Sequence, residues 1–366
     1  MNVSGTRPPF KLRCLVFVLG LWGSSAVALA STLTDVLQSA TERPAVAAAR
    51  LEIEGARSDL ARTEADPFAL TLEKTQAEQR LELTRAQARQ ALYTALSELG
   101  RAYTEQLQAE LEAEVARENE ALSQRLVEVA QIRFRRGSVT ELEVREAEAN
   151  LRVAQAARAA AEETLVLSRT SLQALLPESA ETEAPQPIPE AAAQRPLPGV
   201  AEVLQRASTT PTLLEVKQAL VLARLQSSLL DPSYSSAREI EAARTALEAA
   251  QVSLAETVRT QNAQLRTLYA QATAAQELYR AQKSAAQAAS SRLSFQQDRF
   301  SRGLISALEL RQSAFTATNA RLELLRAKHT YVTSVFDLQA AAATELWPLG
   351  SPAVPDPASD AGGGAG

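Results

Sequence analysis

Apolar residues recur in the second half of the chain at the spacing of a helix that packs against another helix. From 240 to 254 they follow alternating steps of three and four residues, and the alternation resumes from 265 to 279. This spacing keeps apolar side chains on one stripe of a helix, as in a coiled coil. Thr257 and Gln261 interrupt the stripe. The pattern predicts long helices packed in antiparallel pairs.

Glycine and proline divide the chain into two halves of similar layout, each with a short, a long and a medium helix. The predicted helices are 45–65, 70–135 and 139–176 in the first half, and 212–230, 236–301 and 305–346 in the second. At 1.5 Å per residue the long helices extend about 100 Å. The turns reverse the chain, so the two shorter helices should lie end to end along the flank of the long one.

Composition supports an all-α fold of long antiparallel coiled-coil hairpins in two tandem repeats. Aromatic residues make up only 4% of the chain, and helix-forming residues dominate. A protomer with four helix layers buries little area for its length, so it should need partners, and we expect a trimeric α-helical barrel. A solitary soluble coiled coil is the alternative that periodicity leaves open.

The first thirty residues have the layout of a signal peptide. Basic residues at Arg7, Lys11 and Arg13 precede an apolar run, and the small-x-small cleavage pattern follows at 28–30. An N-terminal membrane anchor is the alternative, although the run is shorter than the ~20 residues that span a bilayer. The rest of the chain divides into a first helical repeat (31–176), a proline-rich extended linker (177–198), a second helical repeat (199–346) and a disordered tail (347–366).

Candidate chemistry is sparse. One histidine (His329) and one cysteine (Cys14) cannot build a multi-ligand metal site or a catalytic triad, so we expect no metal, no cofactor and no enzymatic activity. His329 is expected at the surface near a helix end, and Glu162 and Glu163 as ordinary solvated charges. The net charge of −5, with both signs interspersed, argues against a nucleic-acid partner.

A sequence around a glycine occurs twice. Residues 133–145 match residues 299–311 at seven of thirteen positions, and the correspondence continues without gaps to Ser168 and Ser334. Chance similarity between alanine-rich helices is the alternative to a tandem duplication. The glycines Gly137 and Gly303 should take positive φ at a helix end. Ser138 or Thr140 in the first copy, and Ser306 in the second, are placed to cap the next helix.

The duplicated turn and the signal peptide together resemble the TolC family of outer-membrane efflux proteins. Helix pairs of that family turn at a Tyr/Phe-x-x-Gly-x-x-Ser/Thr-x-x-Asp/Glu-Val/Leu sequence. Both copies match at every specified place: Phe134, Gly137, Thr140, Glu143 and Val144 in the first, and Phe300, Gly303, Ser306, Glu309 and Leu310 in the second.

The resemblance implies a homotrimeric periplasmic duct in an efflux or export complex, with a periplasmic adaptor and an inner-membrane transporter as partners. It places the chain, once exported, in the periplasm or at the outer membrane of a diderm envelope. Glu143 and Glu309 would be the acidic residues that narrow the pore. The adaptor contacts at the tips would be Arg136, Gly137, Ser138, Val139, Arg302, Gly303, Leu304 and Ile305.

One departure from the family concerns the β-hairpin that follows a proline between its short and long helices. After Pro67 and Pro232 there is no room for two strands of ~9–11 residues. We therefore expect no membrane barrel from this chain itself, although association with the outer membrane stays open.

Other functions stay open as well. The runner-up is a non-conducting periplasmic spacer or tether of the same ancestry, and a hairpin turn with no binding function would carry the same glycine. A duct needs a polar stripe facing its cavity, and an ordinary solvated face would carry the same residues. The candidates are Gln261, Asn262, Arg266, Gln282 and Lys283.

Overall fold

A computed structural model describes residues 32–177, 185–193, 196–231 and 233–346. Within these ranges the regular structure is helical, and no strand is present. The α-helices are α1 (Leu33–Gln38), α2 (Pro44–Ala65), α3 (Thr71–Arg135), α4 (Glu141–Leu175), α5 (Glu190–Ala193), α6 (Val200–Arg206), α7 (Pro211–Leu229), α8 (Ala237–Ser301) and α9 (Ala307–Ala342), with short 3-10 turns at Ser39–Glu42 and Ala207–Thr209.

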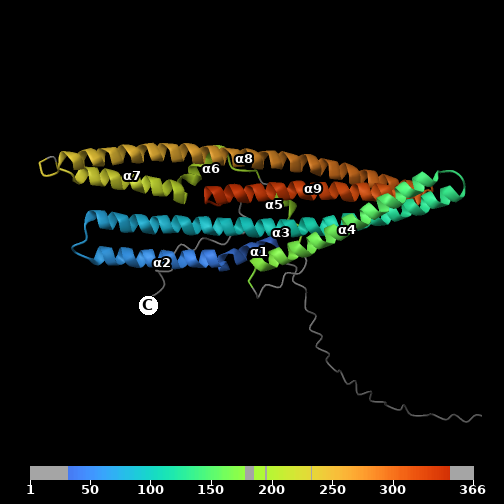
Figure 1. Cartoon of the computed structure of the whole chain (residues 1–366), viewed down its shortest axis with the longest axis horizontal. Helices are drawn as coiled ribbons and strands as arrows, with labels where there is room; N and C mark the ends of the chain where they lie inside the picture. The colour runs from blue at the N-terminus through green and yellow to red at the C-terminus, as the bar shows by residue number, and fades with distance from the viewer. Residues whose placement is uncertain (1–31, 178–184, 194–195, 232, 347–366) are drawn as a thin grey trace, which may run out of the picture.

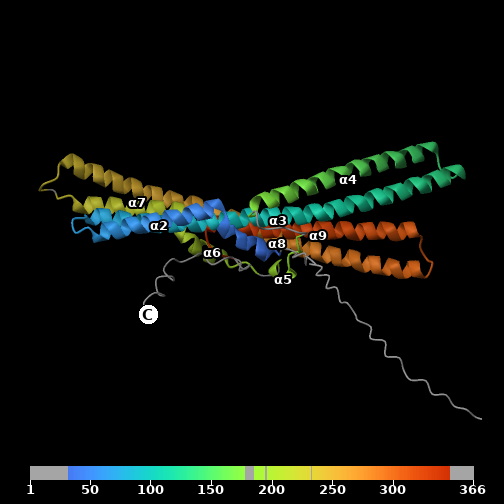
Figure 2. The ribbon, with the colours of Figure 1, turned by 90° about the horizontal axis from the view of Figure 1, so that it is seen from below.

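The long helices α3 and α8 run the length of an elongated slab (Figure 1). Along α3 lie α2 at one end and α4 at the other, and along α8 lie α7 and α9 in the same way. The α3–α4 and α8–α9 turns are at one end of the slab, and the α2–α3 and α7–α8 turns are at the opposite end (Figures 1 and 2). The predicted all-α class and the end-to-end stacking on each long helix are confirmed.

The two halves have closely matching helix boundaries. Both α3 and α8 have 65 residues, and α8 begins 166 positions after α3. Likewise, α9 begins 166 positions after α4. A constant offset over four helices supports the interpretation of a tandem duplication. The connection between α2 and α3 is limited to 66–70, so the described chain turns there without the β-hairpin of the family.

The predicted end of α9 is wrong by four residues. The helix stops at Ala342 because Ala343 takes a left-handed conformation with φ of 48°. The Ala343 N–H then donates to the Ala340 carbonyl at 3.3 Å and the Thr344 N–H to the Gln339 carbonyl at 3.4 Å, which closes the last turn. Glycine is the usual residue at such a position, so alanine there gave no stop signal.

The main core lies at the waist of the slab, where α3 packs against α9. Tyr103, Tyr331 and Phe336 are among the largest fully buried side chains. Ion pairs between the two helices border this core, from Arg101 to Asp337 at 3.1 Å and from Arg326 to Glu112 at 2.8 Å. Half-exposed pairs stabilise little by themselves, so the buried aromatic and aliphatic groups supply most of the contact energy.

The described part of the proline-rich linker packs across this waist. The Tyr103 hydroxyl donates to the Gln186 carbonyl at 2.6 Å, and the Lys328 ammonium donates to the Ile188 carbonyl. Glu190, at the start of the single-turn helix α5, pairs with Lys283 of α8 at 2.7 Å. Residues 185–193 therefore contact α3, α8 and α9 together, which proline spacing alone did not predict.

The helix α1 was not predicted either. Thr32 and Asp35 form a reciprocal capping box at its start: the Asp35 N–H donates to the Thr32 hydroxyl at 3.2 Å, and the Thr32 N–H donates to the Asp35 carboxylate at 2.9 Å. Leu33, Val36 and Leu37 are buried in the main core. The Thr-x-x-Asp spacing is a known start signal and could have located this helix.

Gly100 permits the close approach of α3 to α9. A Cβ atom at this position would lie 2.5 Å from Cε2 of the buried Phe336 ring, whereas a Cβ at Gly55 of α2 would have no neighbour within 4 Å. Replacing Gly100 with valine should lower the free energy of unfolding by about 1–3 kcal/mol, because the core is overpacked. Gly55→Val is the matched control, and chemical denaturation followed by circular dichroism is the measurement. Equal stability of the two variants would contradict the predicted contact.

Candidate functional site

The α3–α4 turn ends α3 with a Schellman motif. Gly137 has a φ of 70°, a conformation that glycine adopts without strain. Its N–H donates to the Phe134 carbonyl at 2.8 Å, and the Ser138 N–H donates to the Arg133 carbonyl at 2.9 Å. These bonds satisfy carbonyl groups that the end of the helix would otherwise leave unpaired.

A capping box begins α4 immediately afterwards. The Glu143 N–H donates to the Thr140 hydroxyl at 3.4 Å, and the Thr140 N–H donates to the Glu143 carboxylate at 3.3 Å. The N-cap is therefore Thr140 and not Ser138, which settles the alternative left open by the sequence. Because Thr140 is a cap, the helix begins at Glu141, two residues after the predicted start.

The α8–α9 turn repeats this geometry. Gly303 has a φ of 69°, with its N–H donating to the Phe300 carbonyl at 2.9 Å. The Glu309 N–H donates to the Ser306 hydroxyl at 3.2 Å, and the Ser306 N–H donates to the Glu309 carboxylate at 2.7 Å. Hydrogen bonds from the Ser306 backbone and then its hydroxyl lower the pKa of Glu309, which therefore stays ionised as a cap.

This geometry explains the spacing of the duplicated motif. Glycine ends one helix, a hydroxyl residue three positions later caps the next helix, and a carboxylate three positions further completes the cap. Glu143 and Glu309 are thus needed by the turns themselves. Both side chains are also exposed, so they are free to face a pore. Their pore-narrowing function stays a prediction.

The two tips present similar but not identical surfaces. Arg136 and Arg302 are exposed at equivalent positions before the glycines. The residue after each glycine differs, because the first tip has Ser138 and the second has Leu304, of which 61% is exposed. A partner would therefore meet the same backbone shape and arginine at both tips, with a polar contact at one and an apolar contact at the other.

A groove of about 630 Å³ lies between the two tips of one chain. It brings together three predicted site residues, Val139, Glu143 and Glu309, with Arg133 also lining its wall. Leu304 and Ile305 line a second hollow of about 430 Å³ on the α8–α9 hairpin, which also includes Glu309. Neither lining includes the remaining predicted tip residues, namely Arg136, Gly137, Ser138, Arg302 and Gly303.

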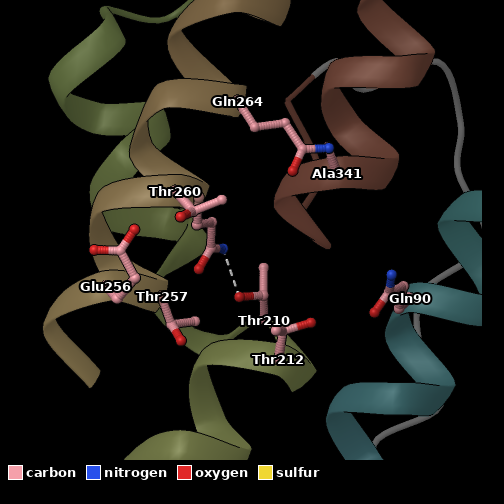
Figure 3. Close-up of a pocket in the computed structure, with 9 residues that line it drawn as sticks. Gln90, Thr210, Thr212, Glu256, Thr257, Thr260, Gln264 and Ala341 are labelled. Carbon is pink, nitrogen blue, oxygen red and sulfur yellow. Dashed lines mark hydrogen bonds between the residues drawn. The ribbon is translucent and has the colours of Figure 1, made fainter. Parts of the chain in front are cut away.

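Two of the candidate pore-lining residues are engaged within the chain. Gln261 donates from its amide to the Thr210 hydroxyl at 2.6 Å and to the Ala207 carbonyl at 3.2 Å. This contact ties α8 to the start of α7, beside a polar hollow of about 350 Å³ (Figure 3). Lys283 pairs with Glu190, as described above. Two of the five candidates are therefore tied to other segments of the same chain.

The expected surface position of His329 is wrong. The side chain is 4% exposed, and neither ring nitrogen has a hydrogen-bond partner in the structure. Burial and then the neighbouring Lys328 lower the pKa of His329 to about 3. Burial also lowers the pKa of Lys328. The sequence places an apolar run, 331–332 and 335–336, just beyond His329, and this run was the available sign that its helix is buried.

Two further features are absent from the described residues. No group of three or more histidine, cysteine or acidic side chains is arranged to hold a metal ion there. Nor does any helix in the described ranges have the combination of length and apolarity that crossing a membrane requires.

Comparison with solved structures establishes the class of fold. The chain resembles CusC with a TM-score of 0.63 at 15% identity, over 85% of this chain and 95% of CusC. It resembles the CmeC outer membrane channel of Campylobacter jejuni with a TM-score of 0.61 at 13% identity, over 90% of this chain and 88% of that one. For the outer membrane protein VceC of Vibrio cholerae the TM-score is 0.57 at 14% identity, over 86% and 96% of the two chains.

The chain therefore has the helical fold of TolC-family outer-membrane channels, as the duplicated turn predicted. At these identities the likeness concerns the fold. By sequence, neither a family model nor a curated protein matches the chain.

Proposed function

We propose that the chain is a TolC-like component of an envelope-spanning efflux or export complex, forming a homotrimeric α-helical duct. The observation that carries this proposal is the pair of equivalent hairpin tips at one end of the slab, in a fold shared with outer-membrane channels. Because these neighbours are channels, the function we propose is to enclose a path and not to catalyse a reaction.

Exposed apolar side chains on the sides of the slab support assembly with further copies. On α4, Val153 is 69% exposed and Leu167 is 61% exposed, while on α8 Val252 is 69% exposed. Burial of such residues against a neighbouring copy would stabilise an oligomer by the hydrophobic effect. Three slabs of four helix layers would close a ring of about twelve helices.

The tips are the proposed adaptor contacts, with Arg136 and Arg302 as the exposed charges and the groove between the tips as the receiving surface. In this proposal the adaptor is periplasmic and connects to an inner-membrane transporter. The chain is exported and lies in the periplasm or against the outer membrane. Glu143 and Glu309, which line the same groove, are placed near the end of the duct.

A non-conducting spacer is the second candidate. The internal contacts of Gln261 and Lys283 favour it, because they give two of the candidate pore-lining side chains a function in packing the single chain. Both candidates predict a helical body of about 100 Å, given 65 residues at 1.5 Å per residue. They differ in cross-section.

Mass and shape of the purified mature protein test the proposal. Analytical ultracentrifugation should give a trimer at micromolar concentration, and negative-stain images viewed end on should show a ring with a stain-filled centre. A trimeric rod without a central hole would favour the spacer. A monomer at that concentration would contradict the duct.

A further inference from the structure

The polar hollow of about 350 Å³ beside Gln261 is enclosed by residues of α3, α7, α8 and α9. Threonine and glutamine side chains make up most of its wall, and among the lining residues Glu256 alone is charged. Gln264 extends from α8 toward Ala341 in the last turn of α9, with Thr210 nearby (Figure 3). The wall is therefore suited to a polar group and not to an apolar one.

The first half of the chain fills the equivalent place with an arginine. Arg43 is the N-cap residue of α2, just as Thr210 is the N-cap residue of α7, and a proline follows each of them. The Arg43 guanidinium donates to the Leu175 carbonyl at 3.1 Å and to the Glu98 carboxylate at 3.2 Å. It thereby satisfies a carbonyl at the end of α4 and joins this end to α3.

The counterparts of these two acceptors both line the polar hollow. Adding the offset of 166 positions to Glu98 and Leu175 gives Gln264 and Ala341. At the N-cap position the short side chain of Thr210 stands where the first half has an arginine. The polar hollow is therefore the space that a guanidinium group occupies in the first half of the chain.

We propose that the polar hollow binds a small guanidinium compound, in the way that the first half holds its own arginine side chain. The Ala341 carbonyl, in the last turn of α9, lies at the negative end of the helix dipole. Glu256 supplies a carboxylate in place of the one lost at position 264. A planar guanidinium can donate to both acceptors at once. This inference does not depend on the proposed function.

The basic side chains around the polar hollow leave this place open. Arg259 pairs with Glu256 at 2.9 Å, but 61% of the glutamate side chain is exposed. Such an exposed pair stabilises little, so a bound cation can share the carboxylate. Arg206 donates to the Glu345 carbonyl at 2.9 Å and is not among the lining residues. On the wall itself, Gln261 Oε1 is buried without a hydrogen-bond partner, which leaves an acceptor that the chain does not satisfy.

Saturation-transfer NMR with n-butylguanidinium tests the site, using the full mature chain. The dissociation constant should be on the order of 1 mM, because so small a ligand makes few contacts. n-Butylammonium has the same charge and the same alkyl chain but lacks the planar fork, so it should bind about fivefold more weakly. Equal binding of the two cations would overturn the proposal, as would the absence of saturable binding by n-butylguanidinium.

A pair of glutamate variants locates the binding. Glu256→Gln should weaken the binding of n-butylguanidinium about fivefold, because it removes the charged acceptor. The matched control is Glu277→Gln, further along α8, since Glu277 also pairs with an arginine three residues later and is 62% exposed. The control should bind as the unsubstituted protein does. Equal losses in the two variants would show that the cation binds to the surface of α8 in general, and the proposal would be wrong.

Filling the polar hollow from within is the third measurement. The double variant Thr210→Arg with Gln264→Glu rebuilds the arginine–glutamate pair of the first half in the second. Its guanidinium should occupy the hollow and abolish binding of n-butylguanidinium, while circular dichroism shows that the helices are retained. Undiminished binding by a variant that remains helical would place the ligand elsewhere and overturn the proposal.

Discussion

Replacing His329 with leucine should remove a large part of the acid sensitivity of the fold. The native pKa is about 3 and the ordinary value is 6.5, so the unfolded chain takes up a proton first as the pH falls. Because proton uptake favours unfolding, the native state should lose about 3 kcal/mol of stability from this group between pH 6.5 and about pH 4. At neutral pH the leucine variant should be equally stable or more stable, since it removes two unpaired buried nitrogens.

The matched control is Gln339→Leu on the same helix. Gln339 is 1% exposed and its amide atoms also have no partner in the structure, but it does not titrate. The free energy of unfolding should be measured by denaturation with urea at several pH values for both variants and the unsubstituted protein. The Gln339 variant should keep the original pH slope. An unchanged slope in the His329 variant would show that the pKa of the imidazole is not lowered in the native state.

Reversing the charge at Arg136 and Arg302 should abolish docking while leaving the fold intact. Both side chains are exposed at the tips, where a substitution usually alters stability by less than about 0.5 kcal/mol. If the arginines contact an adaptor, the double variant Arg136→Glu with Arg302→Glu should abolish recovery of the complex and stop export. The thermal midpoint and the helical signal should stay unchanged.

A cysteine at Ser138 provides the measurement. Cys14 is the only cysteine in the sequence and lies in the predicted signal peptide, so a photo-crosslinker on Ser138→Cys would label a single site. The adduct with a partner should form in the cell envelope and disappear with the charge reversal. Arg244→Cys, on an exposed part of α8 away from the tips, is the control site. Undiminished crosslinking and export in the reversed variant would show that the arginines are only solvated.

A substitution at a turn glycine tests the backbone shape of the turn separately from the charge of the neighbouring arginine. Gly137→Val should cost about 1–2 kcal/mol, because a residue with a Cβ is strained at positive φ. That loss would occur in any hairpin, with or without a partner. The comparison with the arginine variants therefore identifies which effects belong to binding.

The sequence predicted those features of the fold that neighbouring residues along the chain determine. The six main helices were found because glycine, proline and hydroxyl residues mark their ends locally. The packing of the linker was missed because it depends on Tyr103, Lys283 and Lys328, which are distant in sequence and join it only in three dimensions. His329 was misplaced for the same reason: neighbours from the rest of the fold, and not its own helix, determine its burial.

The candidate site was predicted in part. The motif located both tips, because a left-handed glycine and a capping box have fixed spacings along the chain. The groove between the tips was not foreseen, since it requires the relative placement of two hairpins that are far apart in sequence. The cap provided by Glu143 and Glu309 was also missed, although the three-residue spacing from Thr140 and Ser306 is visible in the sequence.

The concentration of buried residues at the waist gives the molecule a gradient of stiffness. The structure describes every residue of 128–153 and 287–316, and none of them is buried. Each hairpin therefore extends from the waist to its tip as two helices without a buried core of their own. The two hairpins diverge in this direction (Figure 2). Local opening costs least where few apolar groups are buried. A force applied at the tips would therefore bend the two hairpins at a lower load than the load that disturbs the packing of Phe336 on Gly100 at the waist.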